Sequence, residues 1–283
     1  MSIDSTDAEL MQRHLACPKC KGDLRIDGVG YSCTACGSQD EIRDRVFPAI
    51  PASQQHSFDD TFNLVELSNE APEIWSMCYE QQSRLAAESI QTGDVVVDVG
   101  CGSKVHFEKM SGAVVIGVDP SFQSLRANTA LDLRVQGGAE SMPLRDRSVD
   151  RMFFFYSIHH MIGKTTNDNF ANLAAALRES GRVVRKGGSI TVFDMNPWWF
   201  AWLAQKLAWN RARTVLADKL NMFFWRQSVL EDIAAGAFTA KTFEHHTFDV
   251  SPLHTFAPVF SIPRLKVPKF MFPFNVQMYK WTF

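Results

Sequence analysis

The run Val-Val-Val-Asp-Val-Gly-Cys-Gly, residues 95–102, is the feature around which the rest of this chain is arranged. Its β-branched residues predict a buried parallel strand, and its acid and glycines predict a tight turn at the carboxyl end of that strand. A second apolar run, Val114–Val118, also ends in an acid, Asp119. Strand, glycine turn, helix, strand and acid form the βαβ unit that binds nucleosides. A nucleoside site is therefore expected where these two strands end.

The same alternation of strands and helices continues toward the C-terminus. Further strands are predicted at 133–136, 151–156 and 189–194, and helices over 122–130 and 167–180. Repeated β/α alternation with short loops predicts an α/β fold with a doubly wound sheet. Residues 61–91 also show helical spacing of apolar residues. That helix either caps the active site or packs on the edge of the sheet.

Composition and charge are those of an ordinary globular protein. Hydrophobic residues make up 46% of the 283 residues, charged residues 21%, and the formal net charge is -2. The total charge therefore indicates no polyanionic partner. The chain lacks the long apolar run of a membrane-spanning helix, and its first residues lack the basic and apolar regions of a signal peptide. A cytoplasmic protein with reduced thiols is expected.

Four of the six cysteines form two Cys-x-x-Cys pairs, Cys17 with Cys20 and Cys33 with Cys36. Each pair can present two thiolates from one tight turn, and four thiolates in tetrahedral array suit Zn²⁺. A module of about 35 residues has too small a core to fold alone, so the metal would stabilise it. Four protein ligands leave no open coordination position, which predicts a structural zinc. The alternatives are two unrelated pairs or redox dithiols.

The residues around these cysteines resemble the zinc ribbon of the small methyltransferase activator subunits. The likeness rests on Leu-x-Cys-Pro-x-Cys-Lys-Gly-x-Leu from Leu15, on Cys-x-x-Cys-Gly from Cys33 and on Ile-Arg-Asp from Ile42. It implies a zinc ribbon over residues 15–50, although Asp40–Phe47 replaces the turn that is usual in the family. Residues 1–14 show no apolar period and are expected to be mobile. Residues 51–60 have the composition of a linker.

The central part of the chain, residues 93–195, is similar to the class I S-adenosylmethionine-dependent methyltransferases, in particular to the ubiquinone and menaquinone biosynthesis branch. The motifs that carry this likeness are Asp98-Val-Gly-Cys-Gly, Gly117-Val-Asp-Pro-Ser, Ala139-Glu-x-x-Pro-Leu-x-Asp-x-Ser-x-Asp150, His159-His160 and Arg182-Val-x-Arg-Lys-Gly-Gly. The resemblance implies a Rossmann-like methyltransferase domain over 61–283 with a seven-stranded, mostly parallel sheet. It also implies a last helix over 229–238, followed by an antiparallel pair of strands at 242–250 and 276–281.

The resemblance further implies which residues bind the cofactor, S-adenosylmethionine. Gly100 and Gly102 let the backbone approach its methionine part, and Asp98 binds the ammonium group or fixes the loop. Asp119 can accept both ribose hydroxyls. The segment Ala139-Glu140 holds the adenine edge. The full predicted set is Asp98, Gly100, Cys101, Gly102, Asp119, Pro120, Ala139, Glu140 and Tyr156.

Two histidines are the candidate catalytic residues. Methyl transfer needs mainly alignment of the sulfonium with its nucleophile and exclusion of water, but a hydroxyl acceptor also needs a base. His159 and His160 follow the fourth predicted strand, at the edge of the sheet where ligands bind. The alternative is that both pack or cap the next helix. No Asn-Pro-Pro-Tyr motif follows that strand, which disfavours methylation of the exocyclic nitrogen of adenine.

An aromatic insertion over residues 197–226 is the clue to the methyl acceptor. It contains five tryptophans, Trp198, Trp199, Trp202, Trp209 and Trp225. A helix of this composition is predicted to form a lid over an apolar substrate, or to lie on a membrane surface with its basic residues near the headgroups. The alternative is a helix buried against its own domain or against a second copy in a homodimer.

Three functions remain open from these patterns. The first is a methyltransferase for a small or lipid-like apolar acceptor, the second an RNA methyltransferase whose ribbon holds the nucleic acid, and the third a non-catalytic scaffold. Ten acidic and six basic residues in 1–60 argue against RNA, because phosphate contacts need Lys and Arg. The scaffold rests on Lys104, which replaces the family's third glycine. That side chain either points outward or obstructs the site.

Overall fold

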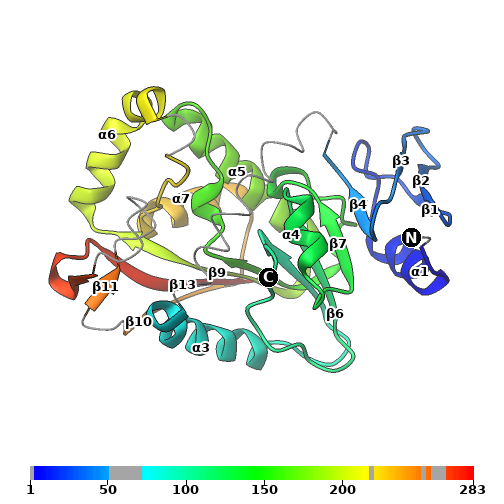
Figure 1. Ribbon diagram of the computed structural model, residues 1–283, viewed down its shortest axis with the longest axis horizontal. Helices are drawn as coiled ribbons and strands as arrows, with labels where there is room; N and C mark the ends of the chain where they lie inside the picture. The colour runs from blue at the N-terminus through cyan, green and yellow to red at the C-terminus, as the bar shows by residue number, and fades with distance from the viewer. Residues whose placement is uncertain (1–2, 51–71, 217–219, 250–252, 256–265) are drawn as a thin grey trace.

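The computed structural model describes residues 3–50, 72–216, 220–249, 253–255 and 266–283 (Figure 1). The strands of its main sheet are β4 (Val46–Pro48), β5 (Val95–Val99), β6 (Val114–Asp119), β7 (Leu133–Gln136), β8 (Val149–Phe155), β9 (Val184–Pro197), β10 (Thr242–Phe248) and β13 (Phe274–Thr282). Their order is β10-β13-β9-β8-β5-β6-β7-β4. Strands β4 to β9 pair in parallel, and β13 is antiparallel to β9 and β10. The predicted α/β class is confirmed.

Helices cover both faces of this sheet. They are α1 (Ser5–His14), α3 (Pro72–Ser89), α4 (Phe122–Ala127), α5 (Thr166–Val183), α6 (Trp199–Leu216) and α7 (Gln227–Ala237). Side chains of β5 alternate between two cores: Val97 packs with α5 and α7, whereas Val96 packs with α3 and α4. This alternation is the period of two that a strand imposes on its side chains. The β-branched run is therefore buried on both faces, as a central parallel strand requires.

The seven strands predicted for residues 61–283 are present, and one further strand extends the main sheet to eight. The additional strand is β4, which lies at the sheet edge and pairs in parallel with β7. It comes from the C-terminal end of the segment predicted to be a separate ribbon. Val46 and Phe47 are buried in the domain core. Their burial, together with the main-chain pairing that satisfies the open edge of β7, explains why the segment joins the sheet.

Residues 5–14 form a helix, which corrects for these residues the expectation of a mobile segment over 1–14. Helix α1 spans Ser5–His14, and the Asp4 side chain accepts from the backbone N–H of Asp7 as its N-cap. Met11 is buried against the main core. The carboxylate of Asp7, also buried, is ion-paired with Arg45 at 2.5 Å. A short helix with a single buried face has little periodicity to detect in sequence.

The cysteine-rich segment forms a three-stranded antiparallel sheet of β1 (Leu24–Ile26), β2 (Gly30–Cys33) and β3 (Gln39–Glu41). Its buried residues Leu24, Tyr31 and Ile42 share one core with the main sheet. The predicted linker over 51–60 and the first part of the helix predicted over 61–91 lie outside the described residues. A third sheet pairs β11 (Leu253–Thr255) with β12 (Lys266–Pro268). Within the described ranges, no helix has both the length and the apolar character to span a membrane.

Candidate functional site

The glycine turn after β5 adopts a backbone that other residues disfavour. Gly100 has φ +73° and Gly102 has φ +56°. A Cβ atom at Gly100 would lie 2.4 Å from Cβ of Ser157, whereas one at Gly102 would meet nothing within 4 Å. The Gly100 N–H donates to the Val118 carbonyl at 2.7 Å. The turn is thus held against β6 and β8 with only main-chain atoms at its tip.

Asp119 joins this turn to the end of β6. Its Oδ2 accepts from the Gly102 N–H at 2.9 Å, and its Oδ1 accepts from the Ser121 N–H at 2.8 Å. The side chain is 8% exposed. A carboxylate oxygen can accept more than one hydrogen bond, so this side chain is suited to bind the hydroxyls of a ligand. The acid predicted to bind a ribose therefore lies directly beside the glycine turn.

Asp98 is a fully buried carboxyl group beneath the same turn. Neither of its oxygens has a hydrogen-bond partner among the described residues. Burial, and after it the charge of Asp119, raises the pKa of Asp98 to about 8. A carboxyl group in this position ionises readily only when a cation or further donors reach it. The orphaned acid and the turn without side chains together fit a ligand that carries an ammonium group.

Other residues near the glycine turn differ in whether their side chains are buried or exposed. Cys101 is buried, and its Sγ points beneath the turn: a Cβ built on Gly117 would lie 2.7 Å from it. Only its backbone can then meet a ligand. Lys104 is exposed, in agreement with the outward alternative. The carbonyl of half-buried Pro120 accepts from Nε2 of Gln136 at 3.1 Å.

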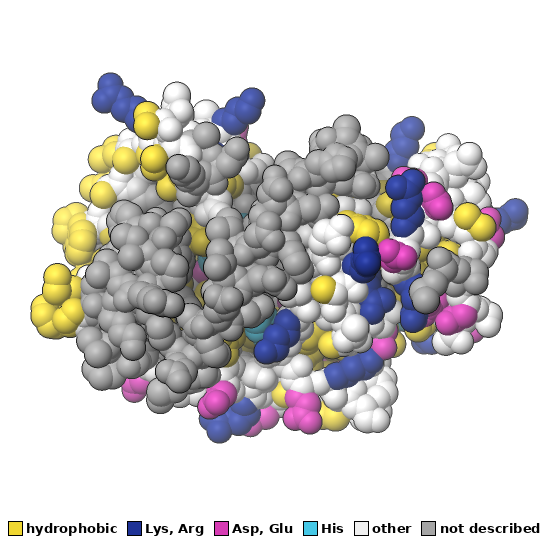
Figure 2. Space-filling model, viewed as in Figure 1, with side chains coloured by type: hydrophobic (Ala, Val, Ile, Leu, Met, Phe, Trp, Pro, Cys, Tyr) yellow, Lys and Arg dark blue, Asp and Glu magenta, His cyan; other side chains and the backbone are white. Residues whose placement is uncertain are grey.

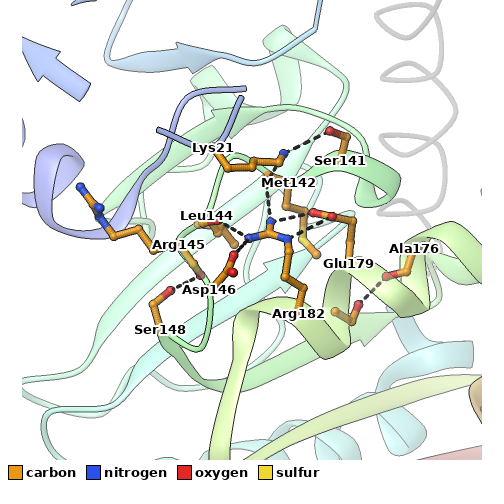
Figure 3. Close-up of polar contacts among 11 residues, drawn as sticks. Lys21, Ser141, Met142, Leu144, Arg145, Asp146, Ser148, Ala176, Glu179 and Arg182 are labelled. Carbon is orange, nitrogen blue, oxygen red and sulfur yellow. Dashed lines mark hydrogen bonds and ion pairs between the residues drawn. The ribbon is translucent and has the colours of Figure 1, made fainter. Parts of the chain in front are cut away.

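The segment Ala139-Glu140 lies in a 3₁₀ turn, η1 (Ala139–Ser141), that is held from two sides. Lys21, which follows the first cysteine pair, donates to the Met142 carbonyl at 2.9 Å and to Oγ of Ser141 at 3.2 Å. Arg182 of α5 donates to the same carbonyl at 3.0 Å. Figure 3 shows both cations directed at this segment. The ribbon therefore supports the segment predicted to hold the adenine edge.

Helix α3 contacts two residues that follow the ends of β5 and β8, His106 and Tyr156. The Tyr156 hydroxyl accepts from Nε2 of Gln82 at 2.8 Å. The Tyr79 ring lies 5.3 Å from that of Tyr156 and stacks on His106 at 4.8 Å between centroids. Ala86 of the same helix packs in the core against β5. The C-terminal half of this helix packs on the sheet, in agreement with one of the two alternatives, and Tyr79 and Gln82 contact Tyr156, a residue of the predicted cofactor set. Tyr79, Gln82 and His106 were not predicted from sequence.

His159 and His160 follow β8 in a second 3₁₀ turn, η2 (Ile158–His160). The buried His159 ring is bonded through Nδ1 to Oδ1 of Asp194 at 2.8 Å. Asp194 belongs to β9, and its Oδ1 also accepts from the Met195 N–H at 2.6 Å. A carboxylate acceptor places the His159 proton on Nδ1 and leaves the lone pair on Nε2. The structure thus adds Asp194, which sequence reasoning missed because it lies 35 positions away.

His160 has a different environment from its neighbour. Its Nδ1 donates to the Asn221 carbonyl at 2.9 Å, and the residue is exposed. The segment after α6 is also bonded to η2, since the Phe223 N–H donates to the His159 carbonyl at 2.8 Å. Trp225 donates through Nε1 to the Ile158 carbonyl at 3.3 Å. The insertion therefore holds the histidine turn directly.

The aromatic insertion packs on one side only. Trp209, Phe223, Phe224 and Trp225 are buried, whereas Trp199 and Phe200 are exposed at 61% and 47%. Gln205 fixes the chain that returns from α6 through two bonds of 2.9 Å to the backbone of Phe224. One of the predicted surroundings, burial against the domain, is thus present on one side, and the side chains on the other side are exposed. Residues 217–219 of the insertion lie outside the described ranges.

The four cysteines of the two pairs converge on one point. Cys17, Cys20, Cys33 and Cys36 have Sγ atoms that all lie within 4.8 Å of one another. Cys17 and Cys33 are buried, and Cys20 and Cys36 are exposed. The spacing of four thiols around one centre fits a tetrahedral metal site. Residues predicted from sequence as ligands are therefore brought together by the fold.

Comparisons with known proteins agree with this arrangement. Residues 97–192 match the family model of a methyltransferase domain. The chain is 32% identical over 107 residues to a demethylmenaquinone methyltransferase of Corynebacterium kroppenstedtii, with 37% of this chain and 43% of the relative covered. It is 28% identical over 149 residues to a demethylmenaquinone methyltransferase of Mycobacterium bovis, with 52% of this chain and 60% of the relative covered. The chain thus spans about half the length of these relatives.

A solved structure shares the fold. An S-adenosylmethionine-dependent methyltransferase of Thermotoga maritima superposes with a TM-score of 0.50 and 19% sequence identity, and the match covers 78% of this chain and 97% of that one. The family match begins within β5 and ends within β9. The residues that match the family model therefore include the glycine turn, Asp119 and both histidines.

Proposed function

We propose that this chain is a class I S-adenosylmethionine-dependent methyltransferase, starting from the match of residues 97–192 to the family model of a methyltransferase domain. We further propose a small or lipid-like apolar molecule as the methyl acceptor. The support for the acceptor class is the aromatic insertion, which packs directly against the histidine turn. The demethylmenaquinone methyltransferases found among the relatives agree with such an acceptor.

The observation that carries the proposal is the pair of acids at the glycine turn. Asp98 is buried without a partner among the described residues, and Asp119 holds Gly102 beside it. S-adenosylmethionine offers an ammonium group for the first acid and two ribose hydroxyls for the second. The segment Ala139-Glu140 is proposed to meet the adenine edge. The bound cofactor supplies a methyl group on an electrophilic sulfonium.

We assign the role of base to His159 rather than His160. The bond to Asp194 leaves the lone pair of His159 on Nε2, and burial keeps the ring in one orientation. Asp194 is then a positioning residue that stabilises the ring once it is protonated. An acceptor hydroxyl bound against Nε2 would lose its proton to His159 as the oxygen attacks. His160, which is exposed and bonded to a main-chain carbonyl, contributes to holding the insertion.

Substitution of His159 by asparagine is expected to lower the rate of methyl transfer to a hydroxyl acceptor by about 100-fold or more, since the base is removed. The affinity for S-adenosylmethionine should stay within about twofold, because the ring lies outside the glycine turn. His160→Asn should lower the rate far less. Single-turnover kinetics and calorimetric titration give the two quantities separately. Equal losses in both histidine variants would contradict the assignment.

The proposed activity is tested by labelled methyl transfer. Zinc-replete protein is incubated with S-adenosylmethionine that carries a labelled methyl group and with lipid, metabolite and RNA fractions of a cell extract. Label is expected in an apolar fraction. Label found only in RNA would overturn the acceptor class and support the RNA alternative. Absence of cofactor binding in isothermal titration would overturn the activity itself and support the scaffold.

We propose Zn²⁺ as the occupant of the cysteine cluster, with a structural role. Chelation is expected to lower the thermal midpoint, because structural zinc contributes on the order of 10 kcal/mol to small ribbons. It should also weaken cofactor binding, since Lys21 reaches from the metal-binding turn to the backbone of Met142. Emission spectroscopy measures the metal content, thermal unfolding measures the midpoint, and calorimetric titration measures the affinity for the cofactor.

A variant that keeps the zinc separates these effects. Lys21→Met removes the contacts to Ser141 and Met142 and leaves all four cysteines in place. It should bind one zinc and bind the cofactor about fivefold more weakly, the effect of roughly one hydrogen bond. Lys19, which is exposed in the same turn, provides the matched control as Lys19→Met. Unchanged cofactor affinity after zinc removal would contradict the proposal that the zinc site supports cofactor binding through Lys21.

A further inference from the structure

Helix α6 exposes an apolar face to solvent. Trp199, Leu203 and Leu207 recur every four residues and are 61%, 41% and 75% exposed. Residues at this spacing lie on one face of a helix. Within the helix only Trp209 is buried. The usual arrangement, in which the apolar stripe faces the core, is therefore reversed on this side of the protein.

A second element extends the same face. The 3₁₀ turn η4 (Lys269–Met271) presents Phe270 and Met271, which are 76% and 58% exposed. It lies across a hollow of about 610 Å³ from Trp198, the residue before α6. Figure 2 shows hydrophobic side chains gathered along this edge of the molecule. We call this region the α6–η4 surface; its residues are Trp199, Phe200, Leu203, Leu207, Phe270 and Met271.

Among the described residues, most charges around this surface are positive. Helix α6 carries Lys206, Arg211 and Arg213 and no acidic residue. Arg211 lies one turn beyond Leu207 on the exposed face, and the η4 turn adds Lys269. Lys269 forms an ion pair with Asp249, whose carboxylate lies 3.7 Å from Nζ. The surface thus combines exposed aromatic and aliphatic side chains with a net positive charge.

We propose that the α6–η4 surface binds the protein to the face of an anionic lipid bilayer. Helices that lie in a membrane interface combine aromatic and aliphatic residues on one side with lysine and arginine beside them. Anionic headgroups would neutralise the two exposed cations of α6, Lys206 and Arg211. A second copy of the chain fits less well, because two-fold pairing would bring these cations against their own equivalents with no acid from α6 between them.

The surface leads toward the histidine turn. Phe274 lines the hollow, and its ring lies 4.8 Å from that of Phe224. The Phe224 ring in turn lies 5.0 Å from that of His159. Apolar side chains therefore connect the membrane-facing hollow to the proposed base. The proposed bilayer-facing surface therefore adjoins the region where the acceptor is proposed to bind, a statement that rests on the proposed function.

Vesicle flotation tests the proposal. The full chain, without cofactor or acceptor, is mixed with vesicles of phosphatidylcholine alone or of phosphatidylcholine with phosphatidylglycerol, at low and at high salt. Binding is expected to the anionic vesicles and to be at least about tenfold weaker on the neutral ones. High salt should also weaken binding to the anionic vesicles, because it screens the charges. No binding to anionic vesicles at low salt would overturn the proposal.

Variants identify the surface responsible. The double variant Leu203→Asp and Leu207→Asp, and separately Phe270→Asp, should each lose at least about tenfold in vesicle binding. Val29→Asp is the matched control, because Val29 is 66% exposed but belongs to the ribbon. Circular dichroism checks that each variant is folded. Retained binding in the variants at α6 and η4 would contradict the assignment.

Sedimentation distinguishes a bilayer from a second copy. If the wild-type chain forms a dimer that the Leu203→Asp and Leu207→Asp variant dissociates, and neither binds vesicles, the surface is a dimer interface and the proposal is overturned. Flotation requires neither cofactor nor catalysis. Failure of membrane binding would therefore leave the proposed methyl transfer intact, and failure of methyl transfer would leave membrane binding intact.

Discussion

Replacement of Gly100 by alanine is expected to weaken S-adenosylmethionine binding by about 100-fold or more. The backbone at Gly100 has φ +73°, and the added Cβ would lie 2.4 Å from Cβ and 3.1 Å from Oγ of Ser157. Ser157 is buried, and its Oγ donates to the Val99 carbonyl at 2.7 Å. It therefore has no space into which to retreat. The turn must open instead, which displaces the main chain that the cofactor is proposed to meet.

Two variants separate the clash from the backbone strain. Gly102→Ala shares the left-handed conformation at φ +56° but meets nothing within 4 Å. Its affinity for S-adenosylmethionine should fall only about tenfold, the effect of roughly 1–2 kcal/mol of strain. Ser157→Gly added to Gly100→Ala removes the clashing atoms and should restore part of the affinity. Calorimetric titration measures all three, and equal losses at the two glycines would refute the steric explanation.

The second large effect is expected at Asp98, where asparagine should lower cofactor affinity by about 100-fold and abolish its pH dependence. Burial raises the pKa of Asp98 to about 8, so the group is mostly protonated at neutral pH. A bound ammonium group favours the carboxylate. Cofactor binding at pH 7 should therefore release close to one proton. Affinity should rise with pH up to about 8 and then level off.

Stability without cofactor should change in the opposite direction with pH. An unfolded aspartate ionises near pH 4, whereas folded Asp98 keeps its proton to about pH 8. Between these values the folded protein binds more protons than the unfolded chain, so the contribution of Asp98 to the free energy of unfolding decreases as pH rises. Asp98→Asn removes this contribution. The variant should be relatively more stable at pH 8 than at pH 5 when compared with the wild-type chain.

Calorimetry in buffers of different ionisation enthalpy measures the proton release, and thermal unfolding across pH measures the stability. Asp150→Asn is the matched control. Asp150 is also buried, but it is ion-paired with Arg185 and bonded to the Val95 N–H, at the opposite end of β5 from the glycine turn. It should leave the proton release unchanged. Absence of proton release in the wild-type chain would refute the proposed role of Asp98.

The parts of the site that sequence predicted correctly are those that follow from local chain order. The glycine turn and Asp119 meet because two adjacent parallel strands end at the same edge of the sheet, so strand and turn patterns suffice to place them. The four cysteines converge for a similar reason, since each pair occupies one turn of one small sheet. The roles assigned to these residues remain predictions.

The parts that sequence missed depend on contacts between distant segments. Asp194 has the pattern of an ordinary strand residue until β9 lies beside β8 and brings it to His159. Lys21 is one of several lysines in a cysteine-rich segment until the ribbon packs on the main sheet, 121 positions from Met142. No local pattern distinguishes either residue.

The sequence by itself therefore determined the α/β class, the order of the parallel strands along the chain and the residues of the glycine turn, because periodicity and turn residues are local properties of the chain. The helix expected between the glycine turn and Val114 was wrong, since residues 100–113 form turns and irregular chain. The tertiary structure alone decided that Val46–Pro48 forms an eighth strand, that residues 5–14 form a packed helix and that α6 turns its apolar face outward. Each of these depends on which surface another segment covers. Burial is set by the packing of the whole chain, and a pattern within one segment does not contain it.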